Sequence, residues 1–189
     1  MPGAVQLLEQ LSTLYPYVQL GIASSSSRAS FDLKTNHLTE TLCIIDKENI
    51  ILGDDPRILA GRGKPSPDIY LAALSTANDR LKAAGHETLI KPEECLVFED
   101  SLSGLEAGRR AGMRVVWCPH PEFVKYAKSE EANPSNLPFT SKEIVNYIKH
   151  NTTDIDGCLD MDDGKWIISV SSLEDIDLTK LGVLGSSIA

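Results

Sequence analysis

Short apolar runs alternate along the chain with longer stretches in which apolar residues recur at helical spacing. The apolar runs are 18–23, 43–45, 50–52, 95–98, 113–117 and 165–170. The helical stretches, in which apolar residues recur about every 3.6 positions, are 5–14, 30–42, 66–81 and 101–111. Short strands that alternate with helices predict an α/β fold with a parallel sheet. In such sheets, ligands bind beyond the carboxyl ends of the strands.

The third helical stretch carries start and stop signals in its sequence. Ser66 can cap a helix, Pro67 suits the first helical position, and Asp68 favours the positive N-terminal end. Gly85 is a residue type that commonly ends a helix. We therefore expect a helix that begins directly after residue 66.

Polar residues able to do chemistry follow two of the apolar runs. Ser24 follows 18–23 and opens a row of four serines, and Glu99 and Asp100 follow 95–98. Because the carboxyl ends of parallel strands meet at one edge of a sheet, we expect these groups to lie close together. A hydroxyl beside exposed amides can bind phosphate oxygens, and adjacent carboxylates can bind Mg²⁺.

Lys64 supplies a positive charge that would suit the same site. It lies in a glycine-containing loop, 61–65, ahead of the third helical stretch, and a lysine offers a compact charge to a phosphoryl group. Each feature alone has a simpler interpretation: a serine row is a turn, the glycines form a loop, and paired acids are solvated or cap a helix. Their combination favours a site for a phosphorylated substrate and a hard cation.

Other phosphate- and metal-binding motifs do not match. The segment ending at Lys64 differs from a P-loop, because Pro65 replaces the required Ser or Thr and Ile58 replaces the first glycine. Receiver domains place their acids first and their lysine last, whereas here the order is hydroxyl, lysine, acids. The five aspartates of 151–164 lack the calcium-loop spacing, and we interpret that stretch as a solvated acidic loop.

Composition narrows the class of protein. The length of 189 residues suits one domain. The net charge of -9 argues against nucleic acid as a partner, because phosphate backbones are bound by clustered Lys and Arg. No apolar run reaches the roughly 20 residues of a membrane helix, and we expect no secretory leader and no membrane partner. The scattered cysteines predict thiols in a reducing, cytoplasmic compartment rather than disulfides or zinc: Cys43, Cys95, Cys118 and Cys158.

Three segments in order resemble the motifs of the haloacid dehalogenase-like (HAD) superfamily of phosphotransferases. The run 18–23 with Ser24 is similar to the second motif, a strand ending in Ser or Thr. Segment 63–70 resembles the third, a lysine followed by proline and a helix, and 96–108 resembles the fourth, an apolar strand followed by acids and a helix with small residues. The resemblance covers about 1–120 and implies a Rossmann-like parallel sheet with flanking helices.

The resemblance also implies roles for the candidate residues in Mg²⁺-dependent hydrolysis of a phosphomonoester. Ser24 and the backbone amide of Ser25 would hold phosphoryl oxygens. Lys64 would bridge the phosphoryl group and the nucleophile, and Glu99 with Asp100 would bind the Mg²⁺.

Segments 30–35 and 52–56 are similar to pseudouridine-5'-phosphatase-like and glycerol-phosphatase-like members of the family. The expected partner is therefore a small phosphorylated metabolite: a sugar, nucleoside or polyol phosphate. In this family a cap domain selects the substrate, and no cap is visible in the sequence.

The first family motif, an apolar strand followed by Asp-x-Asp-Gly, is not matched upstream of the others. That motif supplies the nucleophile and the general acid/base, and its strand lies between those ending at Ser24 and Glu99. We therefore expect 1–189 to be a single, N-terminally truncated HAD core that lacks the first strand and the cap. Such a chain should be nearly inactive alone, with a poorly stable or repacked sheet.

Two alternatives remain open. The chain can be a catalytically dead remnant that binds phosphate, metal or a partner chain. Alternatively, Asp154 can be the nucleophile, because 154–157 reads Asp-Ile-Asp-Gly, although the preceding 149–153 is polar rather than an apolar strand.

Overall fold

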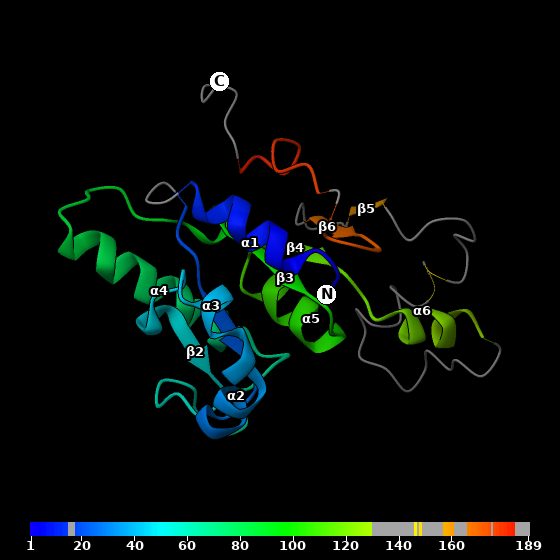
Figure 1. The fold of residues 1–189 in the computed structure, drawn as a ribbon, viewed down its shortest axis with the longest axis horizontal. Helices are drawn as coiled ribbons and strands as arrows, with labels where there is room; N and C mark the ends of the chain where they lie inside the picture. Colours follow the sequence, from blue (N-terminus) through cyan, green and yellow to red (C-terminus); the bar gives the residue numbers. More distant parts are fainter. Residues whose placement is uncertain are drawn as a thin grey trace.

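A computed structural model shows two small sheets with helices packed around them (Figure 1). It describes residues 1–14, 18–129, 146, 148, 157–160, 166–174 and 176–183. The α-helices are α1 (Ala4–Ser12), α2 (Arg28–Thr35), α3 (Thr39–Leu42), α4 (Asp68–Ala83), α5 (Leu102–Arg110) and α6 (Pro121–Lys128). Short 3₁₀ helices are η1 (Asn36–Leu38), η2 (Lys47–Asn49) and η3 (Pro92–Glu94). The strands are β1 (Ile22–Ser24), β2 (Ile50–Leu52), β3 (Leu96–Glu99), β4 (Arg114–Trp117), β5 (Gly157–Asp160) and β6 (Trp166–Ser169).

Most of the strand pairing is parallel, as the alternation of runs and helices predicts. β1 pairs in parallel with β2, and the second sheet has the order β3-β4-β6-β5, in which only β5 is antiparallel. The register places Glu99 opposite Trp117 at the carboxyl end of β3. The α/β fold with a parallel sheet and flanking helices is confirmed.

β1 and β3 belong to different sheets and form no ladder with each other. Within the described residues, β1 therefore pairs only with β2, and β3 only with β4. Backbone groups on such an edge need other hydrogen-bond partners. The carbonyl of Ala23 has one, because the ammonium of Lys64 donates to it at 3.0 Å.

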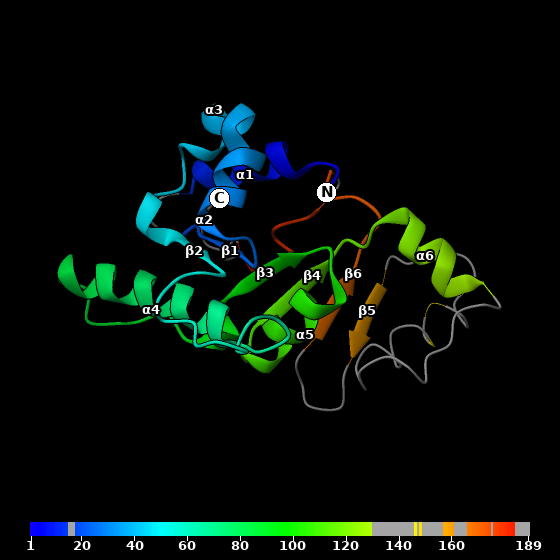
Figure 2. The same cartoon turned by 90° about the horizontal axis from the view of Figure 1, so that it is seen from below.

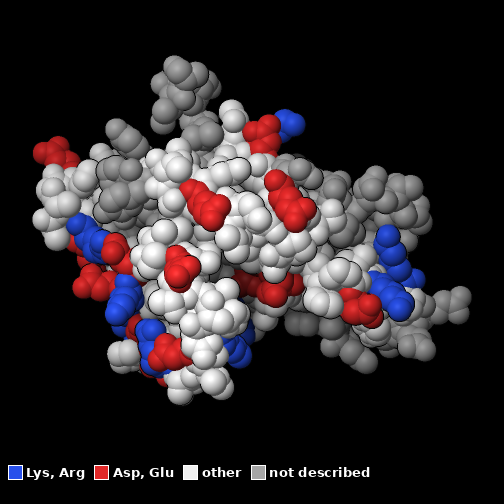
Figure 3. All heavy atoms as spheres, in the orientation of Figure 1, with Lys and Arg blue, Asp and Glu red and all other residues white. Residues whose placement is uncertain are grey.

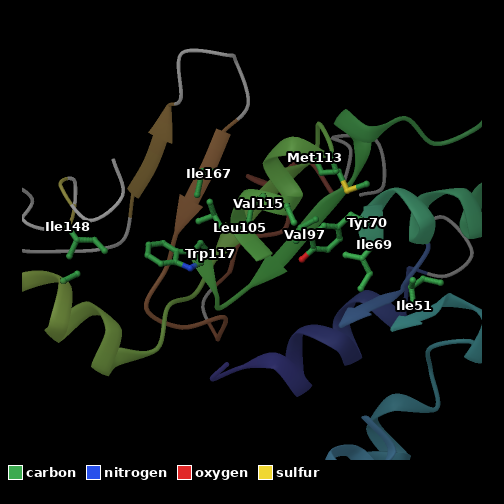
Figure 4. Packing of buried hydrophobic residues seen from close by; sticks show 13 residues of the cluster. Ile51, Ile69, Tyr70, Val97, Leu105, Met113, Val115, Trp117, Ile148 and Ile167 are labelled. Atoms are coloured by element: carbon green, nitrogen blue, oxygen red, sulfur yellow. The ribbon is translucent and has the colours of Figure 1, made fainter. Parts of the chain in front are cut away.

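Consecutive residues of β4 enter two different hydrophobic cores. Val115 and Trp117 lie in the cluster that α4 and α5 cover, whereas Val116 packs with residues of α1 and of the segment after β6. Figure 2 shows α1 on one side of the larger sheet and α4 and α5 on the other, and Figure 4 shows the first cluster from close by. Both valines are fully buried, as expected for an interior strand of a parallel sheet with two covered faces.

The start of α4 differs from the prediction. The helix begins at Asp68, Pro67 is the residue before it, and no side chain caps the helix. The hydroxyl of Ser66 instead donates to the carboxylate of Asp68 at 2.5 Å, and Arg62 donates to the same carboxylate at 2.9 Å. The hydroxyl of Ser66 therefore bonds to the carboxylate of Asp68, whereas a simple capping pattern predicts that it bonds to a backbone N–H at the start of the helix.

Two further expectations need correction. The predicted helix over 30–42 is divided into α2, η1 and α3, because Asn36 begins a tighter 3₁₀ turn. The predicted acidic loop over 151–164 does not hold for 157–160, since these residues form β5 against β6. The other residues of that stretch, including Asp154, lie outside the described residues.

The described helices include none with the length and apolar character that crossing a bilayer requires. On the face shown in Figure 3, acidic side chains stand alone across the middle, and most Lys and Arg side chains lie toward the left and right, in keeping with the net charge of -9.

Candidate functional site

The serine row forms a turn at the carboxyl end of β1. Ser24 is half-buried, and its hydroxyl oxygen accepts a hydrogen bond from the backbone N–H of Ser26 at 3.3 Å. Ser25 is exposed, and Ser27 caps α2 by accepting from the N–H of Ser30. The turn therefore brings a hydroxyl, exposed backbone and a helix N-terminus together, which is a suitable arrangement for binding an anion.

Gly53 lets the end of β2 approach this turn closely. Its N–H donates to the carbonyl of Ser26 at 3.0 Å, and a Cβ at this position would overlap the backbone of Ser25. Asp54 follows, and its carboxylate accepts from the N–H of Arg28 at 2.8 Å. The serine turn is thus held from the side by backbone and side-chain contacts with the loop after β2.

Lys64 reaches this edge from the loop before α4. Arg62 ties the loop to Asp68, and Arg110 of α5 donates to the carbonyl of Pro65 at 3.4 Å. The side chain of Lys64 is only 8% exposed. Its ammonium donates to the carbonyl of Ala23, the residue before Ser24, and also forms an ion pair with Glu99.

Glu99 points into the protein from the end of β3. One carboxylate oxygen accepts hydrogen bonds from Lys64 and from the hydroxyl of Tyr70. The other accepts from Ser101, from its N–H at 3.3 Å and from its hydroxyl at 3.1 Å. Burial acts to raise the pKa of Glu99, but the charge of Lys64 and the hydrogen bonds from Lys64, Tyr70 and Ser101 outweigh it and hold the pKa below its usual value.

Asp100 is placed differently from Glu99. Its side chain is exposed, while its carbonyl accepts from the indole N–H of Trp117 at 3.2 Å. Consecutive residues at a strand end point in opposite directions, so one carboxylate is buried against Lys64 and the other is open to solvent.

The structure therefore brings together the three predicted clusters. Lys64 joins the strand end before Ser24 to Glu99, and Asp100 follows at the same edge. Two residues that donate hydrogen bonds to Glu99 were not identified as site residues from the sequence: Tyr70 and Ser101. For Ser101 a signal was available, because it follows the acids and caps α5 by accepting from Gly104. Tyr70 reads simply as an apolar position of α4 and carries no such signal.

These features define an α/β protein with a lysine–carboxylate centre at the carboxyl edge of its parallel strands. The model of the haloacid dehalogenase-like hydrolase family matches residues 1–112. The chain belongs to this family, which confirms the resemblance found in its motifs.

The chain is also similar to relatives that are named as phosphatases. The chain is 41% identical over 122 residues to a probable pseudouridine-5'-phosphatase of Saccharomyces cerevisiae, covering 65% of this chain and 48% of the relative. It is 35% identical over 125 residues to the mitochondrial (DL)-glycerol-3-phosphatase 1 of Arabidopsis thaliana, covering 66% of this chain and 37% of the relative. The chain spans about half the length, or less, of these curated relatives.

A solved structure shares the fold. A haloacid dehalogenase-like protein of Agrobacterium tumefaciens superposes with a TM-score of 0.50 at 19% identity, over 92% of this chain and 59% of the other. At this identity the likeness concerns the fold alone.

The ion pair at Glu99 leads to a prediction about acid. Because the pKa of Glu99 is lower in the folded protein than its usual value of 4.5, the unfolded chain binds a proton here more readily. The stabilisation by Glu99 is therefore complete above the unfolded pKa and is lost as the pH falls through the folded pKa. We expect the difference in free energy of unfolding between wild type and Glu99→Gln to narrow below about pH 4.5. Denaturant titrations across this range would measure it, and a difference that stays constant would contradict the prediction.

Proposed function

We propose that the chain forms part of a Mg²⁺-dependent phosphomonoester hydrolase for a small sugar, nucleoside or polyol phosphate. The observation that carries this proposal is the ammonium of Lys64, which lies between the strand end before Ser24 and the carboxylate of Glu99. The phosphatase names of the relatives support it.

Phosphate would bind at the serine turn. The hydroxyl of Ser24 and the N–H of Ser25 would donate to phosphoryl oxygens. Lys64 has three N–H donors. Among the described residues, two of these go to Ala23 and Glu99, which leaves one for a phosphoryl oxygen. A fixed positive charge at this point would offset negative charge that develops during transfer.

Asp100 fits a Mg²⁺ site at this edge. Mg²⁺ in phosphate-handling sites is held by one or two carboxylates together with phosphate oxygens and several waters. Asp100 offers an exposed carboxylate, whereas both oxygens of Glu99 already accept hydrogen bonds, so Glu99 would contribute through water. The described residues contain no cluster of three or more metal-binding side chains, so substrate oxygens and waters would complete the site. Bound Mg²⁺ would neutralise charge on the phosphoryl oxygens.

The nucleophile would come from the family's first motif. An aspartate on a strand between β1 and β3 would attack phosphorus, the bond to the alcohol oxygen would break, and the second aspartate of the motif would protonate that oxygen. Water would then attack the aspartyl-phosphate, releasing inorganic phosphate and restoring the carboxylate. Among the described residues β1 pairs only with β2 and β3 only with β4, and this pairing supports a strand between β1 and β3.

A second candidate function is a binding protein that keeps the phosphate or metal site, or that receives a strand from a partner chain. The observation that favours it is again the separation of the two sheets.

Assays of p-nitrophenyl phosphate hydrolysis with Mg²⁺ separate the two candidates. Turnover that is lost in Asp100→Asn or Lys64→Ala supports an enzyme, and phosphate binding without turnover supports the binding protein. Unchanged turnover in Asp154→Asn would eliminate Asp154 as the nucleophile.

Phosphate affinity gives the direct test of the site. We expect Lys64→Ala to weaken binding of inorganic phosphate, measured by calorimetry with Mg²⁺ present, by about tenfold or more, since a hydrogen bond to a charged group is lost. Lys128→Ala is the matched control, because Lys128 is an exposed lysine at the end of α6. Equal affinities of wild type and Lys64→Ala would remove Lys64 from the site and contradict the proposal.

A further inference from the structure

Tyr70 contacts both members of the buried ion pair. Its side chain is 7% exposed and lies on the first turn of α4. Its hydroxyl donates to the Glu99 oxygen that also accepts from Lys64. The ammonium of Lys64 lies 4.8 Å from the centre of the Tyr70 ring, within the range of a cation–π contact. The phenol therefore borders the charge that the proposed site uses.

The hydroxyl of Tyr70 donates to the same Glu99 oxygen as Lys64, so that this oxygen accepts two hydrogen bonds. Without it, that oxygen of Glu99 would accept only from Lys64, among the hydrogen bonds described for it. The ammonium would then be drawn closer to Glu99 and away from the serine turn. Burial, followed by the negative charge of Glu99, raises the pKa of Tyr70 above its usual value, so the hydroxyl keeps its proton and remains a donor.

We propose that Tyr70 is a positioning residue of the phosphate site, whose hydroxyl and ring keep the Lys64 ammonium available to a phosphoryl oxygen. This inference rests on the proposed function, because it assigns Tyr70 a role toward the lysine that binds phosphate there. A purely structural role is the competing interpretation, since Tyr70 also belongs to the core cluster with Val97 and Leu105. That role belongs to the ring, and Tyr70→Phe preserves the ring while removing the hydroxyl.

The test measures two quantities on the full 189-residue chain. One is the dissociation constant of inorganic phosphate with Mg²⁺ present, and the other is the ¹H–¹⁵N signal of the Lys64 ammonium, which does not depend on phosphate. We expect Tyr70→Phe to raise the dissociation constant about fivefold and to shift the ammonium signal. Tyr126→Phe, at an exposed tyrosine of α6, should change neither.

The outcomes separate this inference from the proposed function. If Lys64→Ala weakens phosphate binding but Tyr70→Phe leaves affinity and ammonium signal as in wild type, Tyr70 has no positioning role and the phosphate site stands. If Lys64→Ala leaves phosphate affinity unchanged, the proposed function and this inference are both overturned. Should Tyr70→Phe not fold, the wild-type chain decides: a nuclear Overhauser contact between the Lys64 ammonium and the Tyr70 ring supports the role, and its absence overturns it.

Discussion

Glu99→Ala should lower the free energy of unfolding by about 3–5 kcal/mol, the range measured when one partner of a buried ion pair is removed. The side chains of Glu99 and Lys64 are each 8% exposed. Truncation would leave the ammonium of Lys64 buried without its counter-charge, and would leave Tyr70 and Ser101 without their acceptor. Chemical denaturation at neutral pH measures the change.

The control for Glu99→Ala is Glu93→Ala, which removes an exposed acid from η3 and should change stability little. A double variant tests the cause. Replacing the pair by Lys64→Met with Glu99→Leu removes both buried charges, and should recover much of the lost stability. A loss below about 1 kcal/mol in Glu99→Ala would mean that water reaches the ammonium of Lys64 and solvates it.

Gly104→Ala should destabilise the protein by about 2 kcal/mol or more, within the range found for overpacked interiors, although alanine is the better helix former. Gly104 lies on the first turn of α5, where its N–H donates to the hydroxyl of the capping residue Ser101. A Cβ here would overlap the carboxyl group of Glu99. On helix propensity alone the change would stabilise the chain by about 1 kcal/mol, so the sign of the effect tests the packing against Glu99.

Gly63→Ala is the control for Gly104→Ala, because a Cβ at Gly63 would meet no atom within 4 Å. Its stability should stay within about 0.5 kcal/mol of wild type. If Gly104→Ala is as stable as wild type or more stable, the carboxylate of Glu99 can move aside without leaving Lys64.

The spacing of apolar residues was sufficient to predict the helices and strands that bury their own apolar side chains. The runs at 95–98 and 113–117 became β3 and β4, and the periodic stretch after Ser101 became α5. Strand length was less predictable. The run 18–23 forms a strand only at Ile22–Ser24, because a strand extends only where a neighbour pairs with it.

The sequence predicted those features of the site that depend on where a residue lies along its strand. Ser24 and Glu99 lie at the carboxyl ends of β1 and β3, as expected, and Lys64 joins these strand ends from the loop before α4. The sequence could not predict that Glu99 is buried and Asp100 exposed. It shows two adjacent acids, but not which of them the pleat of the strand turns inward. Tyr70 was missed because its hydroxyl matters only through a carboxylate that lies 29 positions away in sequence.

The side chains of β3, like those of β4, alternate between two cores, and this has a consequence for the chemistry at the end of β3: Val97 lies in one core, and Leu96 and Phe98 pack against the other. A slip of β3 by one residue along β4 would turn every inward side chain of β3 outward. Asp100 would then face Lys64, and Glu99 would turn away from it. Such a slip would also move Val97 to the core of Leu96 and Phe98, and so place it among the wrong neighbours. Leucines of α1, on the far side of the sheet, therefore help to select which acid neutralises the lysine.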